Sequence, residues 1–184
     1  MNKTEKSSFL LHCCCASCST YPLQILKEIF HITVFFYNPN IHPLEEYTLR
    51  ENELKELSMK WMFSYLAGPY EINMWTNRIK GFESELEGGG RCEICYRLRL
   101  EETARFAKEK GDVFFGTTLS LSPHKKAHII NRIGKEIENK WGVRYYEADF
   151  KKKDGFKMSC KISQEENLTR QNYCGCIYSR PQVK

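Results

Sequence analysis

The chain has 184 residues, 41% of them hydrophobic and 13% aromatic, a composition that excludes a disordered protein. Its formal charge of +5 permits a polyanionic partner without requiring one. Residues 1–8 are polar and no apolar run approaches the length of a membrane span, so neither a signal peptide nor membrane association is expected. We therefore expect a cytoplasmic protein that forms a single domain over residues 1–184.

The first half of the chain alternates strand and helix patterns. Residues 9–12 predict a strand, and a helix follows them. The β-branched and aromatic run at residues 31–37 predicts a second strand, buried on both faces and ended by an Asn-Pro-Asn turn. A long helix is expected after Pro43, and residues 63–70 contain a third, short strand. Three residues are candidates for the cap of the first helix: Ser17, Ser19 and Thr20.

The second half continues the alternation. Residues 91–110 predict a helix that ends near Gly111, and residues 112–115 predict a strand. Ser122 and Pro123 have the residue types of a helix start, and residues 143–146 predict a last strand. Strands that alternate with helices indicate an α/β fold with a parallel, doubly wound sheet. Such sheets place their sites at the carboxyl ends of the strands.

Nine cysteines carry most of the chemical information. The cytosol keeps thiols reduced, so clustered cysteines there indicate metal or redox chemistry. Cys14 and Cys15 follow the first predicted strand, while Cys92 and Cys95 form a C-x-x-C at a predicted helix start. Four such thiolates hold an iron–sulfur cluster or a tetrahedral zinc equally well. The zinc alternative is a staple made of two C-x-x-C pairs, with Cys18 in place of Cys14.

A second unusual feature is Cys174-Gly175-Cys176. Glycine between two cysteines lets the backbone bring their sulfurs together. A disulfide across one residue closes a small, strained ring and is easily reduced, which suits an electron-relay dithiol. The alternative is two unrelated cysteines in a turn.

Basic runs and absent motifs limit the choice of partner. Lys125-Lys126 and Lys151-Lys152-Lys153 suit phosphate contacts, although such runs also occur as solvated faces. Neither G-x-x-x-x-G-K-[ST] nor G-x-G-x-x-G occurs, so the sequence does not predict ATP or NAD binding.

Six stretches occur in the order of a known family: HCCCASCS, NPNIHPLEEYTLR, RCEICYRLRLEETA, TTLSLSPHKK, EADFKKKDGF and RQNYCGC. As an ordered set, covering residues 9–176, they resemble the QueH-type epoxyqueuosine reductases. The resemblance implies a Rossmann-like, HUP-like parallel sheet with helices on both faces. It also implies the reduction of epoxyqueuosine to queuosine at the wobble position of tRNA, which is a two-electron deoxygenation of an epoxide.

The same resemblance implies a [4Fe–4S] cluster and a redox-active cysteine pair, Cys174 and Cys176. The family motif Cys-Cys-Ala-Pro-Cys reads here Cys-Cys-Ala-Ser-Cys with an extra Cys13 in front, which leaves a one-residue ambiguity in the ligands. Adjacent residues point different ways in an extended segment. An open alternative is therefore that one of Cys14 and Cys15 binds a second, mononuclear iron beside the cluster, together with a cysteine of the C-G-C pair. The cluster ligands selected by the alignment are Cys14, Cys15, Cys92 and Cys95.

The expected partners are a tRNA that carries epoxyqueuosine and an external, unidentified electron donor. We expect three basic residues to contact phosphate or substrate: Arg97, Lys125 and Arg170. Two alternative functions remain at this stage, a thiol oxidoreductase with a structural zinc and a non-catalytic RNA-binding module with a zinc staple.

Overall fold

The computed structural model describes residues 6–179, which form a five-stranded sheet in the order β3-β2-β1-β4-β5. Every neighbouring pair of strands is parallel, as predicted for a doubly wound α/β fold. The strands are β1 (Ser7–His12), β2 (Phe30–Phe36), β3 (Ser64–Ala67), β4 (Phe114–Thr117) and β5 (Arg144–Tyr145).

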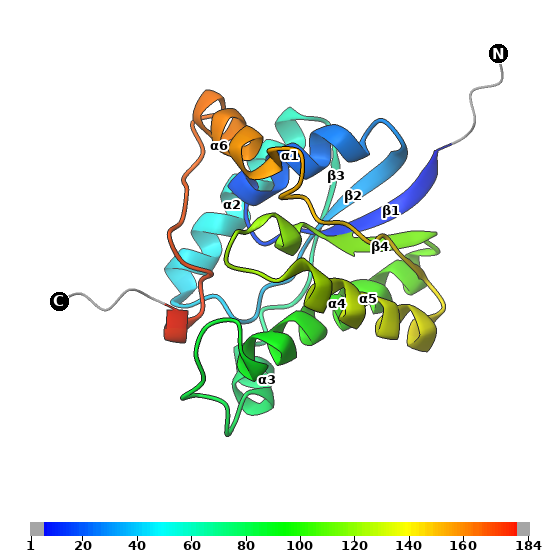
Figure 1. Ribbon diagram of the computed structural model, residues 1–184. Helices are drawn as coiled ribbons and strands as arrows, with labels where there is room; N and C mark the ends of the chain where they lie inside the picture. Colours follow the sequence, from blue (N-terminus) through cyan, green and yellow to red (C-terminus); the bar gives the residue numbers. More distant parts are fainter. Residues whose placement is uncertain (1–5, 180–184) are drawn as a thin grey trace, which may run out of the picture.

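Helices cover both faces of the sheet. Helices α1, α2 and α6 lie on one face, and α4 and α5 lie on the other (Figure 1). None of the helices described is long and apolar enough to cross a membrane. The helices are α1 (Ala16–Leu26), α2 (Leu44–Lys60), α3 (Ile72–Arg78), α4 (Gly90–Lys110), α5 (Ala127–Trp141) and α6 (Gly155–Glu165), with 3-10 turns at Thr118–Leu121 and Ile177–Ser179.

The central strands are buried on both faces. In β1, Leu11 packs into the cluster beneath α1 and α2, and Leu10 packs into the cluster beneath α4 and α5. In β2, Val34 packs into the first of these clusters and Phe35 into the second, and all four side chains are inaccessible to solvent. The continuous apolar runs of these strands therefore reflect a parallel sheet with helices on both sides.

The start of α1 differs from the sequence prediction. The helix begins at Ala16 with Cys15 as its N-cap residue, so the serine and threonine candidates for the cap lie inside the helix. Two of them bond back to backbone carbonyls, Ser19 to Cys15 at 2.7 Å and Thr20 to Ser17 at 3.2 Å. Buried hydroxyls satisfy themselves within the preceding turn in this way, which makes them poor markers of a helix start.

Helix α5 also begins later than predicted, at Ala127 instead of at Ser122 and Pro123. The chain after β4 first forms a 3-10 turn, in which Thr117 Oγ1 accepts a hydrogen bond from the backbone N–H of Leu119 at 3.1 Å. A contact from a distant segment holds the loop that follows. The ammonium of Lys151 donates to the carbonyl oxygens of Ser120 at 2.8 Å and Lys125 at 3.1 Å.

Candidate functional site

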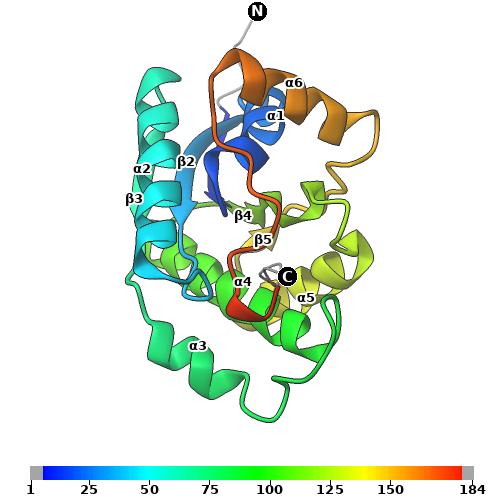
Figure 2. The ribbon, with the colours of Figure 1, turned by 90° about the vertical axis from the view of Figure 1, so that its left-hand side faces the viewer.

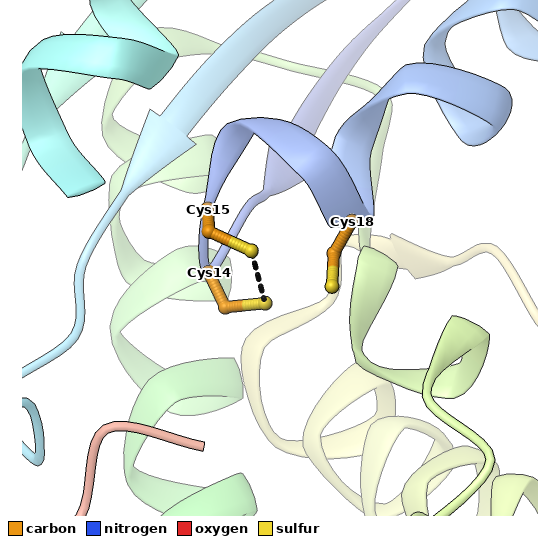
Figure 3. A group of neighbouring side chains, drawn as sticks. All are labelled: Cys14, Cys15 and Cys18. Atoms are coloured by element: carbon orange, nitrogen blue, oxygen red, sulfur yellow. Dashed lines mark hydrogen bonds between the residues drawn. The ribbon is translucent and has the colours of Figure 1, made fainter. Parts of the chain in front are cut away.

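The first cysteine group lies where β1 ends and α1 begins. Cys13 continues the strand pairing, with its N–H bonded to the Phe35 carbonyl at 2.8 Å, and its side chain packs in the core. The next residues turn the other way. The sulfurs of Cys14, Cys15 and Cys18 all lie within 4.8 Å of one another, and those of Cys14 and Cys15 are 3.9 Å apart (Figure 3). The structure therefore separates Cys13 from the other three.

Charge in this group concentrates on one sulfur. Hydrogen bonds from Cys15 and Cys18 lower the pKa of Cys14 well below its ordinary value, and the nearby Lys125 and Arg99 act in the same direction. The hydrogen bond to Cys14 in turn raises the pKa of Cys15 to about 11. The arrangement favours a Cys14 thiolate flanked by two thiols, and a thiolate is the form that binds metals.

The second cysteine group gathers at the start of α4. Cys92 and Cys95 lie one helical turn apart, and the backbone N–H of Gly88 donates to the Cys92 sulfur at 3.2 Å. Cys95 packs with Cys176 in an apolar cluster that includes Trp75, and burial raises the pKa of Cys95. Segments that are far apart in sequence thus supply this group.

The C-terminal segment brings the C-G-C stretch to the same place. After α6 the chain runs past the carboxyl ends of the strands to the start of α4 (Figure 2). Cys174 lies beside Ser179, with its sulfur 2.9 Å from the hydroxyl oxygen, and a hydrogen bond from Cys176 lowers the pKa of Cys174. Gly175 has a φ of 97°, and a Cβ there would lie 2.8 Å from Ile41, so both conformation and space require glycine.

Arg50 fixes this segment, and the sequence analysis did not identify it. Its side chain is 2% exposed and pairs with Glu46 at 2.6 Å. Its Nη1 and Nη2 donate to the carbonyl oxygens of Cys174 and Tyr173 at 3.2 and 3.3 Å. The available signal was a charged residue on the apolar stripe of a helix, between Tyr47 and Leu54, because such a residue needs a buried partner.

Two cavities adjoin the cysteine groups. The first, of about 190 Å³, opens beside Cys14, Cys15 and Cys18, and the second lies between Cys92, Cys95 and Cys176. Four residues line both cavities and therefore connect the two cysteine groups: Glu87, Arg99, Lys125 and Cys174.

Of the three residues expected to contact phosphate or substrate, two lie at the cavities and one does not. Lys125 lines both cavities, and Arg170 lines the first, where its guanidinium lies 5.3 Å from the centre of the Phe156 ring. Arg97 lines neither of these cavities. It is 41% exposed and pairs with Glu136 on the outer surface of α4 and α5.

The donor set around the cavities fits a thiolate-bound metal. Soft sulfur ligands select iron–sulfur clusters or zinc over oxygen-seeking cations. The Trp75 indole N–H is buried without a hydrogen-bond partner among the described residues, in the apolar cluster that also holds Cys95 and Cys176. Together with the N–H of Gly88 it supplies the donors that tune sulfur in iron–sulfur centres. The cysteines that line one or both cavities are Cys14, Cys15, Cys18, Cys92, Cys95, Cys174 and Cys176.

Solved structures share the fold at low sequence identity. The chain matches a structure titled U34-tRNA thiolase NcsA from Methanococcus maripaludis with its [4Fe-4S] cluster, with a TM-score of 0.58, 12% identity and coverage of 96% of this chain and 63% of that one. It also matches a predicted subunit of tRNA methyltransferase from Methanocaldococcus jannaschii, with a TM-score of 0.56, 12% identity and coverage of 88% and 89%. These likenesses confirm the α/β architecture.

Sequence comparison gives the family. The chain is 38% identical to the epoxyqueuosine reductase QueH of Streptococcus pyogenes, over 96% of this chain and 72% of the relative. It is also 38% identical to the one of Thermotoga maritima, over 92% of this chain and 88% of the relative. The model of the family described as epoxyqueuosine reductase QueH matches residues 9–182. The family resemblance of the motifs is therefore confirmed, and the chain belongs to the QueH family of epoxyqueuosine reductases.

Proposed function

We propose that this protein reduces epoxyqueuosine to queuosine in tRNA. Membership of a family of epoxyqueuosine reductases supports the reaction. The observation that carries the proposal for this chain is the position of Cys174, which lines both cavities and so adjoins both cysteine groups. A redox-active thiol in that position reaches an open pocket for substrate and a thiolate-rich centre for electrons.

The proposed cofactor is a [4Fe–4S] cluster. When bound, such a cluster supplies electrons one at a time at a potential set by its surroundings. The proposal leaves Cys18 free, although its sulfur lies within 4.8 Å of those of Cys14 and Cys15. We assign Cys18 to a second, mononuclear iron. The cluster ligands in this proposal are Cys14, Cys15, Cys92 and Cys95.

The proposed reaction balances with a dithiol. Both C–O bonds of the epoxide break, a C=C bond forms, and the oxygen leaves as water, which consumes two electrons and two protons. Oxidation of Cys174 and Cys176 to a disulfide supplies both electrons and both protons. An external one-electron reductant, acting twice with two protons from water, restores the dithiol. Lys125 and Glu87 line both cavities and are placed to move protons between the thiols and the epoxide oxygen.

The first cavity has the composition of a nucleotide site. Its wall carries Arg170 and Lys125, and Phe156 offers an exposed ring against which a base can stack. Outside the cavity, Lys126 and Lys152 are exposed on loops that Lys151 ties together. We propose that the modified nucleoside enters the cavity while these loops contact tRNA phosphates.

A mass-spectrometric turnover assay tests the proposed function. Anaerobically reconstituted protein, dithionite and tRNA containing epoxyqueuosine are expected to give queuosine in the digested tRNA. Cys174→Ser is expected to keep its iron and sulfide and to lose multiple turnover, while Cys160→Ser, on α6 outside both cavities, is the matched control. Full turnover by Cys174→Ser rules out the relay, and a fully loaded wild-type protein that leaves epoxyqueuosine unchanged rules out the function.

A further inference from the structure

Arg99 is a buried cation on the cysteine-bearing face of α4. It lies four residues after Cys95 and seven after Cys92, spacings that place the three side chains along one side of the helix. The residue is 2% exposed. Burying a guanidinium is costly unless an acceptor or an opposite charge compensates it, so the surroundings of Arg99 indicate its role.

Arg99 has no carboxylate partner among residues 6–179. No Asp or Glu forms an ion pair with it in this part of the chain. Its Nε donates to the Cys95 carbonyl and its Nη1 to Asn38 Oδ1, both at 3.3 Å, and both acceptors are neutral. The buried Arg50, in contrast, has the Glu46 carboxylate at 2.6 Å.

The cavities that Arg99 lines carry thiols from three segments, together with the charged side chains of Glu87 and Lys125. Burial alone would lower the pKa of Arg99, but Cys95, Cys14 and Cys174 outweigh burial and raise it. The Tyr96 ring lies 5.9 Å from the guanidinium carbon. Arg99 also lines both cavities, so its charge lies between the two cysteine groups.

We propose that Arg99 is the counter-charge of the cysteine-held centre, a positioning residue whose fixed positive charge stabilises negative charge on the surrounding sulfurs and thereby raises the reduction potential of the centre. The inference rests on the proposed metal centre and not on the identity of the substrate. A centre that gains one electron becomes more negative by one charge, and a cation within the protein favours that state because the low dielectric screens it little.

A redox titration without tRNA tests the proposal. Anaerobically reconstituted wild type and Arg99→Gln are titrated with dithionite and mediators, and reduction is followed by visible absorption and EPR. Removal of the charge is expected to lower the one-electron reduction equilibrium constant by at least about tenfold, which is a negative shift of about 59 mV. Arg99→Lys retains the charge and is expected to keep most of the wild-type potential, although it loses the planar fork.

A second variant neutralises the charge without removing the arginine. Asn38→Asp places a carboxylate of the same size against Nη1 of Arg99, and it is expected to shift the potential in the same direction as Arg99→Gln. This variant decides the question if Arg99→Gln fails to fold. The matched control is Arg105→Gln, on the same helix, where the arginine is 36% exposed and already paired with Glu102 and Glu109. The reduction potential of the Arg105→Gln protein is expected to equal that of the wild type.

The outcomes separate this proposal from the proposed function. A residue that serves only the fold would leave the potentials of Arg99→Gln, Asn38→Asp and wild type equal, and that result overturns the proposal. Equal shifts in Arg99→Lys and Arg99→Gln also overturn it, because the charge would then be irrelevant. A wild-type protein without a reducible centre overturns it together with the cofactor. If Arg99→Gln shows the expected negative shift from the wild-type potential while the wild type leaves epoxyqueuosine unchanged, the role of Arg99 is supported and only the proposed function is contradicted.

Discussion

Arg50 donates from Nη1 to the carbonyl oxygen of Cys174 at 3.2 Å, although the two residues are 124 positions apart. The guanidinium also lies 5.1 Å from the centre of the Tyr173 ring and is held from behind by Glu46. Helix α2 thereby fixes the backbone of the C-terminal segment just where its first cysteine enters the cavities. The position of the proposed relay depends on this contact because a long connection from α6 has no regular structure of its own.

Arg50→Met is expected to release the relay segment. The change leaves two carbonyl oxygens and the Glu46 carboxylate without their buried donor, which costs about 3 kcal/mol of unfolding free energy. Urea unfolding measures this loss, and turnover is expected to fall more than iron content. Arg50→Lys keeps the positive charge but loses the planar guanidinium, so its stability and turnover are expected to lie between those of the wild type and Arg50→Met. Unchanged turnover in a folded Arg50→Met protein would show that Cys174 does not need this anchor.

Gly175→Ala is expected to disturb the cysteine pair directly. A φ of 97° costs an alanine about 1–2 kcal/mol, and its Cβ would also press against Ile41 at 2.8 Å. Unfolding free energy is expected to drop by at least that amount, and the rate of Cys174–Cys176 disulfide formation is expected to change. Gly111→Ala serves as the control, since Gly111 has a φ of 75° at a helix end with open space around it. A Gly175→Ala protein that is no less stable than the wild type would contradict the close packing of this segment.

Cysteine variants are expected to separate two iron sites. Cys18→Ser is expected to lose about one iron per chain and no sulfide, whereas Cys92→Ser is expected to lose the about four irons and four sulfides of a cluster. Cys160→Ser, at a cysteine that lines neither cavity, is the control for general damage. Iron and acid-labile sulfide analysis after anaerobic reconstitution gives both numbers. Loss of sulfide from Cys18→Ser would instead place Cys18 among the cluster ligands.

Asp112→Asn is expected to stabilise the metal-free protein at neutral pH. Burial raises the pKa of Asp112, and its Oδ2 has no hydrogen-bond partner. The folded state therefore binds a proton more tightly than the unfolded state, so the stability linked to this group is present below the unfolded value of 3.8 and is lost as the pH rises through the folded pKa. Asparagine mimics the protonated carboxyl.

Urea unfolding at several pH values tests the predicted pH dependence of this stability gain. The gain from Asp112→Asn is expected to be largest near neutral pH and to disappear below pH 3.8. Glu56→Gln, at an exposed carboxylate of α2, is the control for the loss of a surface charge. A gain that persists at low pH would show that the carboxylate charge is not its cause.

The basic loops are expected to contribute phosphate contacts. Lys126→Gln and Lys152→Gln are each expected to weaken tRNA binding and to reduce the slope of log K against log salt by about 1. Fluorescence anisotropy across a salt series measures both. Lys60→Gln is the control, because Lys60 is exposed at the end of α2 and pairs with Glu166 at 2.7 Å. Equal salt slopes for Lys126→Gln and Lys60→Gln would contradict the assignment of this surface to tRNA.

Local patterns in the sequence predicted the parallel sheet because hydrophobic periodicity and strand composition are local properties. Helix starts were less predictable, as α1 and α5 show, because Cys15 caps by backbone geometry alone and Lys151 holds the loop before α5 from a distance. The motifs marked the cysteines of both groups. They gave no sign that Cys13 faces the core, or that Arg50 and Arg99 compensate for their burial through residues on other segments. Those relationships exist only in three dimensions.

The measurement that tests the central claim most directly is the absorption spectrum of protein purified without oxygen, together with iron, zinc and sulfide analysis. The claim is that cysteines from distant segments hold an iron–sulfur centre beside Cys174. It predicts a brown protein with a broad band near roughly 400 nm that dithionite bleaches, and the proposed second iron would add iron in excess of sulfide. A colourless protein that holds tight zinc after anaerobic reconstitution would contradict the claim and favour a zinc-stapled thiol oxidoreductase or RNA-binding module.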